Sequence, residues 1–194
     1  MRLGVEHILF GFDHLLFVLA LVLLVRDWRR VALTVSAFTL AHSLTLAAAT
    51  LGFVSVPGPP IEAAIALSIV VIAAEIVNTR RGSPSVAARW PWLVAFCFGL
   101  LHGFGFAGAL AQVGLPHHAI PIALLFFNIG VELGQLAFVA AILTTGAIVR
   151  RALAFRSRPA LLQQAANKFH VMAAYAIGAV ASFWLIERTS AFFV

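Results

Sequence analysis

Charged residues are scarce in this sequence, and their scarcity excludes a soluble globular protein. Asp, Glu, Lys and Arg together make up 10% of the 194 residues, whereas 62% of the residues are hydrophobic. A soluble domain has about 25% charged residues. The chain therefore has too little polar surface to cover a globule in water, and we expect the lipid bilayer to be the solvent for most of it.

Cysteine is nearly absent as well, since Cys97 is the only one. An intramolecular disulfide is thereby excluded, and cysteine usage does not indicate a redox compartment. Nucleic acid is not an expected partner despite the net charge of +6. The basic residues lie in short segments between apolar runs, and aromatic residues are not interleaved with them as a stacking platform requires.

Long hydrophobic runs are what the sequence has in abundance. Six runs predict six transmembrane helices in a single all-α transmembrane domain that covers residues 1–194. Basic, proline-rich or glycine-containing segments separate the runs, and the segment from Arg150 to Lys168 is the longest predicted loop. The runs lie near residues 5–25, 31–51, 61–79, 92–111, 120–148 and 170–187.

The distribution of basic residues predicts the orientation of these helices. Of the 13 Lys and Arg residues, all except Arg2 and Arg188 follow the first, third or fifth run. Cytoplasmic loops of membrane proteins carry the excess of Lys and Arg. We therefore expect the basic loops in the cytoplasm and both termini outside.

Polar and ionisable residues inside membrane helices are costly and usually functional. With a rise of about 1.5 Å per residue, those of four runs fall roughly 12–18 Å below the predicted outer surface. Because these runs alternate in direction, their polar side chains share one layer, which chance placement would not give. The residues of this layer are Asp13, His14, His42, His102, Asn128 and Glu132.

A divalent transition metal is the ligand that this layer favours, because imidazole suits zinc, copper, iron and nickel and carboxylates favour harder divalent ions. A bound ion also offsets the cost of burying carboxylates. The predicted metal ligands are His14, His42, His102, Asp13 and Glu132. The residues expected to orient these ligands or to line the approach from outside are His7, Ser43, Asn128, Gln135 and Glu62.

Each of these residues taken alone has a structural alternative. A single buried histidine is often a hydrogen-bonded packing residue, and Glu62 follows Pro60 at a helix start, where an acid favours the helix dipole. Small residues at 99, 103 and 107, and at 130 and 134, predict close helix contacts. The joint occurrence of three histidines in one layer is what favours the metal.

Four motifs in order resemble a known family. The first is H-x-x-x-G-x-D-H at residues 7–14, and the others lie at 38–45, 98–107 and 127–135. Together they are similar to the HupE/UreJ family of membrane proteins, in its type 2 branch. That resemblance implies a secondary permease for nickel or cobalt in the bacterial inner membrane. The better-known nickel branch has proline after its first histidine, where this chain has Ile8.

We therefore expect a permease for a divalent transition metal, with Ser68, Glu75 and Asn78 as candidates for the path inward. The rival reading is an intramembrane zinc hydrolase, since three histidines and an open position form a catalytic zinc site. Asp13 or Glu132 would then be the general base, and Ser43 would assist. The expected partners are the lipid bilayer and the metal ion, which is nickel, cobalt or zinc. The sequence leaves a homo-oligomer open.

Overall fold

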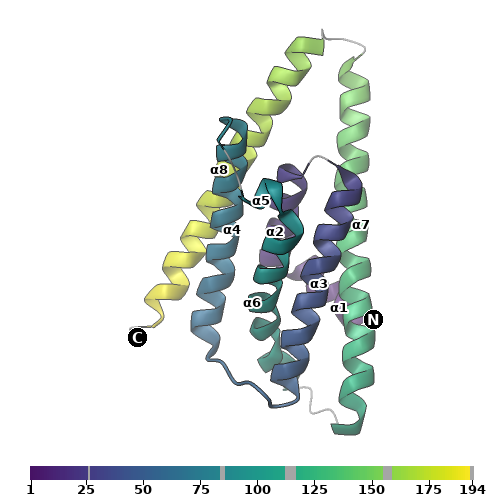
Figure 1. Cartoon of the computed structure of the whole chain (residues 1–194), viewed down its shortest axis with the longest axis vertical. Helices are drawn as coiled ribbons and strands as arrows, with labels where there is room; N and C mark the ends of the chain where they lie inside the picture. The colour runs from purple at the N-terminus through teal and green to yellow at the C-terminus, as the bar shows by residue number, and fades with distance from the viewer. Residues whose placement is uncertain (26, 84–85, 112–116, 155–158, 193–194) are drawn as a thin grey trace.

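The computed structural model describes residues 1–25, 27–83, 86–111, 117–154 and 159–192. Every regular element within these ranges is helical, as the apolar runs predict (Figure 1). In chain order they are α1 (Arg2–Phe10), α2 (Phe12–Leu24), α3 (Trp28–Thr50), α4 (Gly58–Arg80), α5 (Val86–Arg89), α6 (Pro91–Ala111), the 3₁₀ turn η1 (His117–Ala119), α7 (Ile120–Ala154) and α8 (Pro159–Ser190).

The long helices alternate in direction along one common axis. In Figure 1 the ends of α2, α4 and α7 lie toward the top, together with the starts of α3, α6 and α8. The basic segments predicted to face the cytoplasm connect the elements at that end. The ends of α3 and α6 and the starts of α4 and α7 lie toward the other end. This arrangement agrees with the alternation expected from the positions of Lys and Arg.

Four helices are long and apolar enough to cross a bilayer, namely α3, α4, α7 and α8. The pair α1 and α2 passes the same test only as one span bent by 75°, and the apolar stretch Pro91–Phe106 of α6 is shorter. The chain is thus a multi-pass membrane protein with four to five candidate spans in its described part. The count of six spans, and the orientation with both termini outside, stay predictions.

Two boundaries differ from those expected. The run at 5–25 is not one straight helix, because it breaks at Gly11. The predicted loop from Arg150 to Lys168 is largely helical, since α7 continues to Ala154 and α8 begins at Pro159. Arginine, glutamine and alanine are good helix formers, so a helix continues after hydropathy has fallen.

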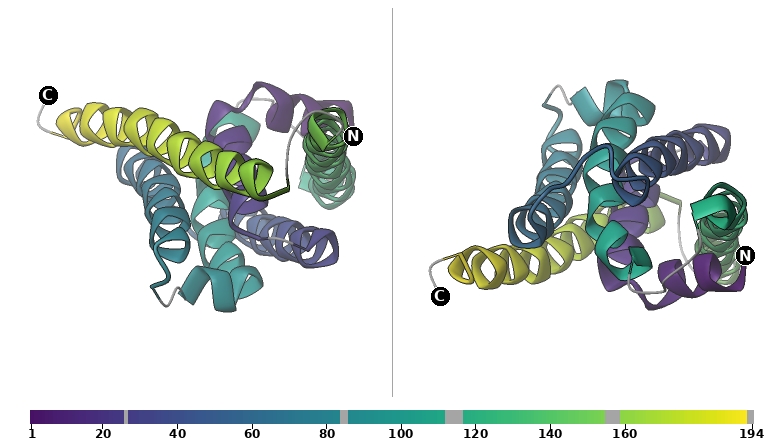
Figure 2. Two further views of the ribbon diagram at one scale, coloured as in Figure 1. Left: turned by 90° about the horizontal axis from the view of Figure 1, so that it is seen from above. Right: turned by 90° about the horizontal axis from the view of Figure 1, so that it is seen from below.

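Two apolar cores hold the bundle together. The larger one packs α2, α3, α4 and α8 around fully buried side chains such as Phe17, Val35 and Ile72. The smaller one joins α1 to α7 around Ile8, Phe127 and Val131. Figure 2 shows the same division along the axis, with α1 lying against α7 on one side and α8 lying along α4 on the other.

Candidate functional site

The break at Gly11 brings the first two histidines together. A continuous helix would separate residues seven apart by about 10 Å along its axis. Instead, the rings of His7 and His14 lie with their centroids 4.6 Å apart. A side chain at residue 11 would meet the His7 carbonyl oxygen at 2.5 Å and His14 Nδ1 at 3.0 Å. Glycine is therefore the residue that fits this bend.

A close contact between α3 and α6 places the other two histidines, His42 and His102, near each other. A Cβ at Gly99 would lie 2.5 Å from the Phe38 carbonyl oxygen, and a Cβ at Gly103 would overlap the carbonyl oxygen of His42. The predicted small-residue contact of this helix is thus confirmed at Gly99 and Gly103. The side chain of residue 107 lies outside the described part. The backbones approach closely enough for His42 and His102 to reach the same region.

His14 is the centre of a cluster of four histidines. Its ring centroid lies 4.6 Å from that of His7, 5.9 Å from that of His42 and 5.1 Å from that of His102. His7 and His42 are also 5.9 Å apart. His14, His42 and His102 are buried. The structure therefore brings the three predicted histidine ligands together and adds His7, which had been expected nearer the outer mouth.

Several ring nitrogens of this cluster are buried without a hydrogen-bond partner among the described residues. They are His7 Nε2, His14 Nε2, both nitrogens of His42, and His102 Nδ1. An unsatisfied buried polar atom costs about 1–3 kcal/mol and requires an explanation. Unpartnered imidazole nitrogens are atoms that a transition-metal ion can use as ligands.

Ser68 on α4 orients His102. Its hydroxyl lies 2.6 Å from the Ile65 carbonyl oxygen, to which it donates, and 3.0 Å from His102 Nε2. A hydroxyl that donates to Ile65 can accept from His102 Nε2, and this arrangement corresponds to the tautomer with the proton on Nε2. The lone pair of His102 then lies on Nδ1, which has no partner in the described structure. Ser68 had been predicted on the inward path rather than beside a ligand.

Phenylalanine rings enclose the four histidines. Phe38 stacks on His42 with centroids 6.1 Å apart, and it also contacts His102 at 5.0 Å. Phe106 lies 4.1 Å from His7 and is stacked on Phe127. Such an apolar shell limits water access and lowers the local dielectric. Phe38 and Phe127, which lie in the second and fourth family motifs, belong to this apolar shell. The sequence analysis did not predict that role.

Each of the two carboxylates of the predicted ligand set has a hydrogen-bond partner, although Glu132 Oε2 is buried without one among the described residues. Both oxygens of Asp13 accept from Arg188 Nη2, at 2.9 and 3.2 Å. Glu132 Oε1 accepts from the Ser36 hydroxyl at 2.5 Å. Among the described residues, no group of three or more His, Cys, Asp or Glu side chains is already arranged to hold a metal ion. The four histidines therefore lie close together, but as their rings stand they do not form a set of metal ligands.

The remaining predicted residues are placed as follows. The hydroxyl of Ser43 donates to the Thr39 carbonyl oxygen within α3, and Gln135 Oε1 accepts from the Thr39 hydroxyl at 2.9 Å. Asn128 Oδ1 is a further buried atom without a partner in the described part of the chain. Glu62 has an exposed side chain, but its carbonyl oxygen accepts from Arg188 Nη1 at 2.9 Å.

Arg188 contacts Asp13 and Glu62 of the predicted site, but the sequence analysis did not single it out. One signal could have found it: with Arg2, it is one of the two basic residues outside the basic loops. It lies near the end of α8 that is opposite to those loops (Figure 1).

The spacing of the histidines suits a transition metal. In a tetrahedral site with metal–nitrogen distances of about 2.1 Å, imidazole centroids stand roughly 5 Å apart. The centroid distances of 4.6–5.9 Å around His14 bracket this value.

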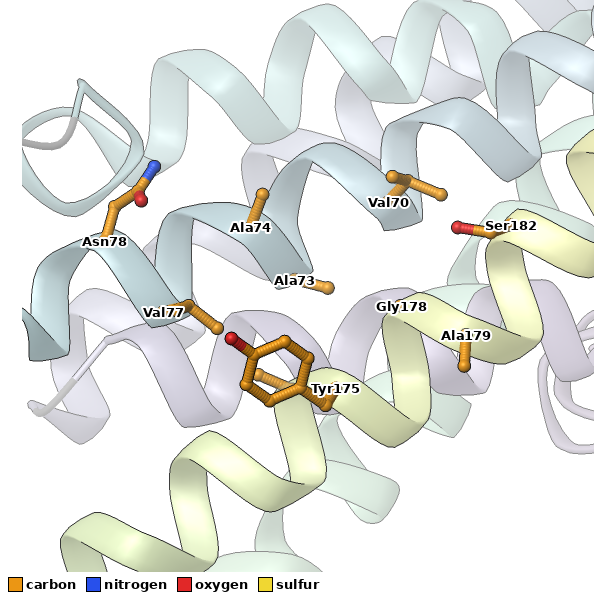
Figure 3. A pocket seen from close by; sticks show the side chains of 10 residues that line it. Val70, Ala73, Ala74, Val77, Asn78, Tyr175, Gly178, Ala179 and Ser182 are labelled. Carbon is orange, nitrogen blue, oxygen red and sulfur yellow. The ribbon is translucent and has the colours of Figure 1, made fainter.

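The two described surface grooves lie elsewhere. One, of about 390 Å³, runs between α4 and α8 and is lined by residues such as Val70, Asn78 and Tyr175 (Figure 3). The other, of about 430 Å³, lies beside Arg80 and Lys168. None of the four histidines lines either groove, and Asn78 of the predicted inward path faces the first.

Comparison with known proteins agrees with the motifs. The family described as HupE / UreJ protein matches residues 1–188. Neither a curated protein nor a solved structure matches the chain. The match covers every helix from α1 to the last turn of α8, and with it all four histidines, Ser68 and Arg188. The chain therefore belongs to the HupE/UreJ family.

Proposed function

We propose that this protein is a permease for a divalent transition metal ion, with nickel or cobalt as the substrate, in the bacterial inner membrane. The observation that carries the proposal is the cluster of four histidines whose buried ring nitrogens lack hydrogen-bond partners among the described residues. Membership of a family associated with nickel and cobalt transport supports the choice of ion.

The four imidazoles are the first ligands of the ion in this proposal. Imidazole nitrogen binds nickel, cobalt and zinc, and a site in an apolar bundle excludes the weakly bound hard cations that prefer oxygen. His14 at the centre binds together with His42 and His102, and His7 completes the set. Ser68 holds His102 in the tautomer that leaves Nδ1 free. Glu132 and Gln135 act from the periphery, where they are bonded to Ser36 and Thr39.

Uptake of metal by proteoliposomes tests this proposal. Purified protein is reconstituted, and saturable uptake of nickel, cobalt and zinc is measured for the wild type and for His102→Ala. His118→Ala, which removes an exposed histidine of η1, is the matched control. We expect saturable uptake that His102→Ala abolishes and His118→Ala leaves unchanged. Equal uptake by all three proteins would contradict the proposal.

One observation favours a second candidate, an intramembrane zinc hydrolase. Fully buried apolar side chains, including Leu21, Val35 and Ile76, lie between the histidines and the end of the bundle that carries the basic loops. An enzyme needs no path through this core, whereas a permease must open one. In this candidate Asp13 or Glu132 is the general base and Ser43 assists. Tightly bound zinc in one-to-one ratio without uptake of any of the three metals would favour the enzyme.

A further inference from the structure

Arg188 makes three hydrogen bonds that join distant parts of the fold. Its Nη2 contacts both oxygens of Asp13, and its Nη1 donates to the Glu62 carbonyl oxygen. Its guanidinium carbon lies 5.6 Å from the ring centroid of Trp184. The side chains of Arg188 and Asp13 are only 20% and 25% exposed. One cation of α8 thus holds the start of α2 and the start of α4 together.

An arginine in this position is costly and requires an explanation. Guanidinium stays protonated under all relevant conditions, and charged residues in membrane helices are rare and usually functional. Asp13 directly precedes His14, the central histidine of the cluster. A divalent ion bound at His14 would therefore find the carboxylate of the preceding residue already paired with a positive charge.

We propose that Arg188 is a tethered cation that competes with the metal for Asp13. This inference rests on the proposed function. In the metal-free protein Arg188 occupies both oxygens of Asp13. When the ion binds to the histidines, Asp13 exchanges Arg188 for the ion, and the guanidinium keeps the Glu62 carbonyl oxygen and the Trp184 ring as partners. When Asp13 takes Arg188 back, the affinity for the ion falls and the ion leaves.

Arg188 is in this view a positioning residue that sets the affinity and the rate of release. If Arg188 were only a structural tie, its removal would change the metal affinity in the opposite direction. Loss of a structural tie loosens the site and weakens binding. Loss of a competing cation strengthens binding, because the ion no longer displaces a partner of Asp13 and no longer approaches a fixed positive charge.

Metal titration of the purified full-length protein distinguishes the two. Zinc is the probe, because its filled d shell leaves tryptophan fluorescence unquenched by electronic effects. We expect Arg188→Gln to bind zinc on the order of tenfold more tightly than the wild type. In liposomes it should show a lower KM for the transported metal and a lower maximal rate, since release becomes slow. Arg81→Gln, which removes an arginine bonded to Tyr175 at the other end of the bundle, should change neither.

A double-mutant cycle locates the effect at the pair. In the Asp13→Asn background, Arg188→Gln should no longer tighten zinc binding, because the group for which the two cations compete is gone. Arg188→Lys keeps the charge and should bind zinc nearly as the wild type does. Where Arg188→Gln folds poorly, the emission of Trp184 tests the exchange with Arg188 still in place.

Trp184 provides a readout that is independent of transport. In a variant with Trp28, Trp90 and Trp92 replaced by phenylalanine, zinc should change the emission of Trp184 as the guanidinium moves relative to its ring. The change should disappear with His102→Ala. If the wild type binds zinc but Arg188→Gln binds it equally or more weakly, the competition is disproved and the permease proposal stands. If the wild type binds no metal at all, both proposals fail.

Discussion

The rings of His7 and His14 lie 4.6 Å apart because the helix that carries them breaks at Gly11. The bend between α1 and α2 is 75°. One glycine of the H-x-x-x-G-x-D-H motif thereby brings two histidines that are seven residues apart into contact. The spacing within the motif follows from this geometry, since the two histidines would otherwise stand one above the other.

Replacement of Gly11 by alanine should separate this pair. The added methyl group would lie 2.5 Å from the His7 carbonyl oxygen, which is backbone and cannot move without shifting α1. We expect metal affinity to fall at least tenfold, measured by zinc titration. Gly146→Ala in α7 is the matched control, because nothing lies within 4 Å of its added methyl group. Equal affinity in both variants would mean that His7 is not a ligand.

Gly103→Ala should destabilise the contact between α3 and α6. Its methyl group would overlap the carbonyl oxygen of His42 and the hydroxyl of Thr45. Overpacking of this kind costs about 1–3 kcal/mol. The midpoint of thermal unfolding in detergent should fall relative to the wild type, whereas Gly146→Ala should leave it equal or slightly higher. An unchanged midpoint for Gly103→Ala would show that the two helices can separate freely.

Ser68→Ala should weaken metal binding without removing a ligand. Its loss leaves His102 Nε2 without an acceptor, so the ring is no longer held in one tautomer. Removal of such an orienting partner typically costs 10- to 100-fold in metal affinity. Ser190→Ala is the control, since Ser190 also donates to a carbonyl oxygen of its own helix but contacts no histidine. If both serine variants titrate as the wild type does, Ser68 does not orient the site.

Glu132→Gln tests the predicted carboxylate ligand that is hydrogen-bonded to Ser36. Its Oε1 accepts from Ser36, and glutamine can keep that bond through its own oxygen. We expect the zinc affinity of Glu132→Gln to fall less than tenfold, in contrast to its loss in His14→Ala. A loss in Glu132→Gln as large as that in His14→Ala would make Glu132 a direct ligand, as the sequence alone had suggested.

Removal of the metal should lower the stability of the wild type more than that of the histidine variants. A ligand that binds only the folded protein stabilises it in proportion to the logarithm of its concentration over Kd. Zinc at about 100 times its Kd should therefore add about 2.7 kcal/mol. A chelator should reverse this gain in the wild type and have no effect on His102→Ala. An equal response of both proteins to the chelator would place the stabilising metal outside the cluster.

The sequence by itself determined the class of fold and indicated three of the four histidines of the cluster. Low charge and long apolar runs require a helical membrane protein, since backbone polar groups in lipid must be satisfied within each segment. Histidines are rare in such runs, so counting residues from the predicted surface placed His14, His42 and His102 at one depth. The order of four motifs indicated the family. These inferences depend on local composition and spacing, which the chain carries in its sequence.

Only the tertiary structure decided how these residues meet. The bend at Gly11 depends on how α1 packs on α7, and the partner of Asp13 is Arg188, 175 residues later. Ser68 reaches His102 because α4 lies beside α6. Contacts between residues far apart in the chain depend on which helix faces pack together and on how they are rotated. Helical periodicity does not specify that choice, because almost every face of these helices is apolar and fits lipid as well as protein.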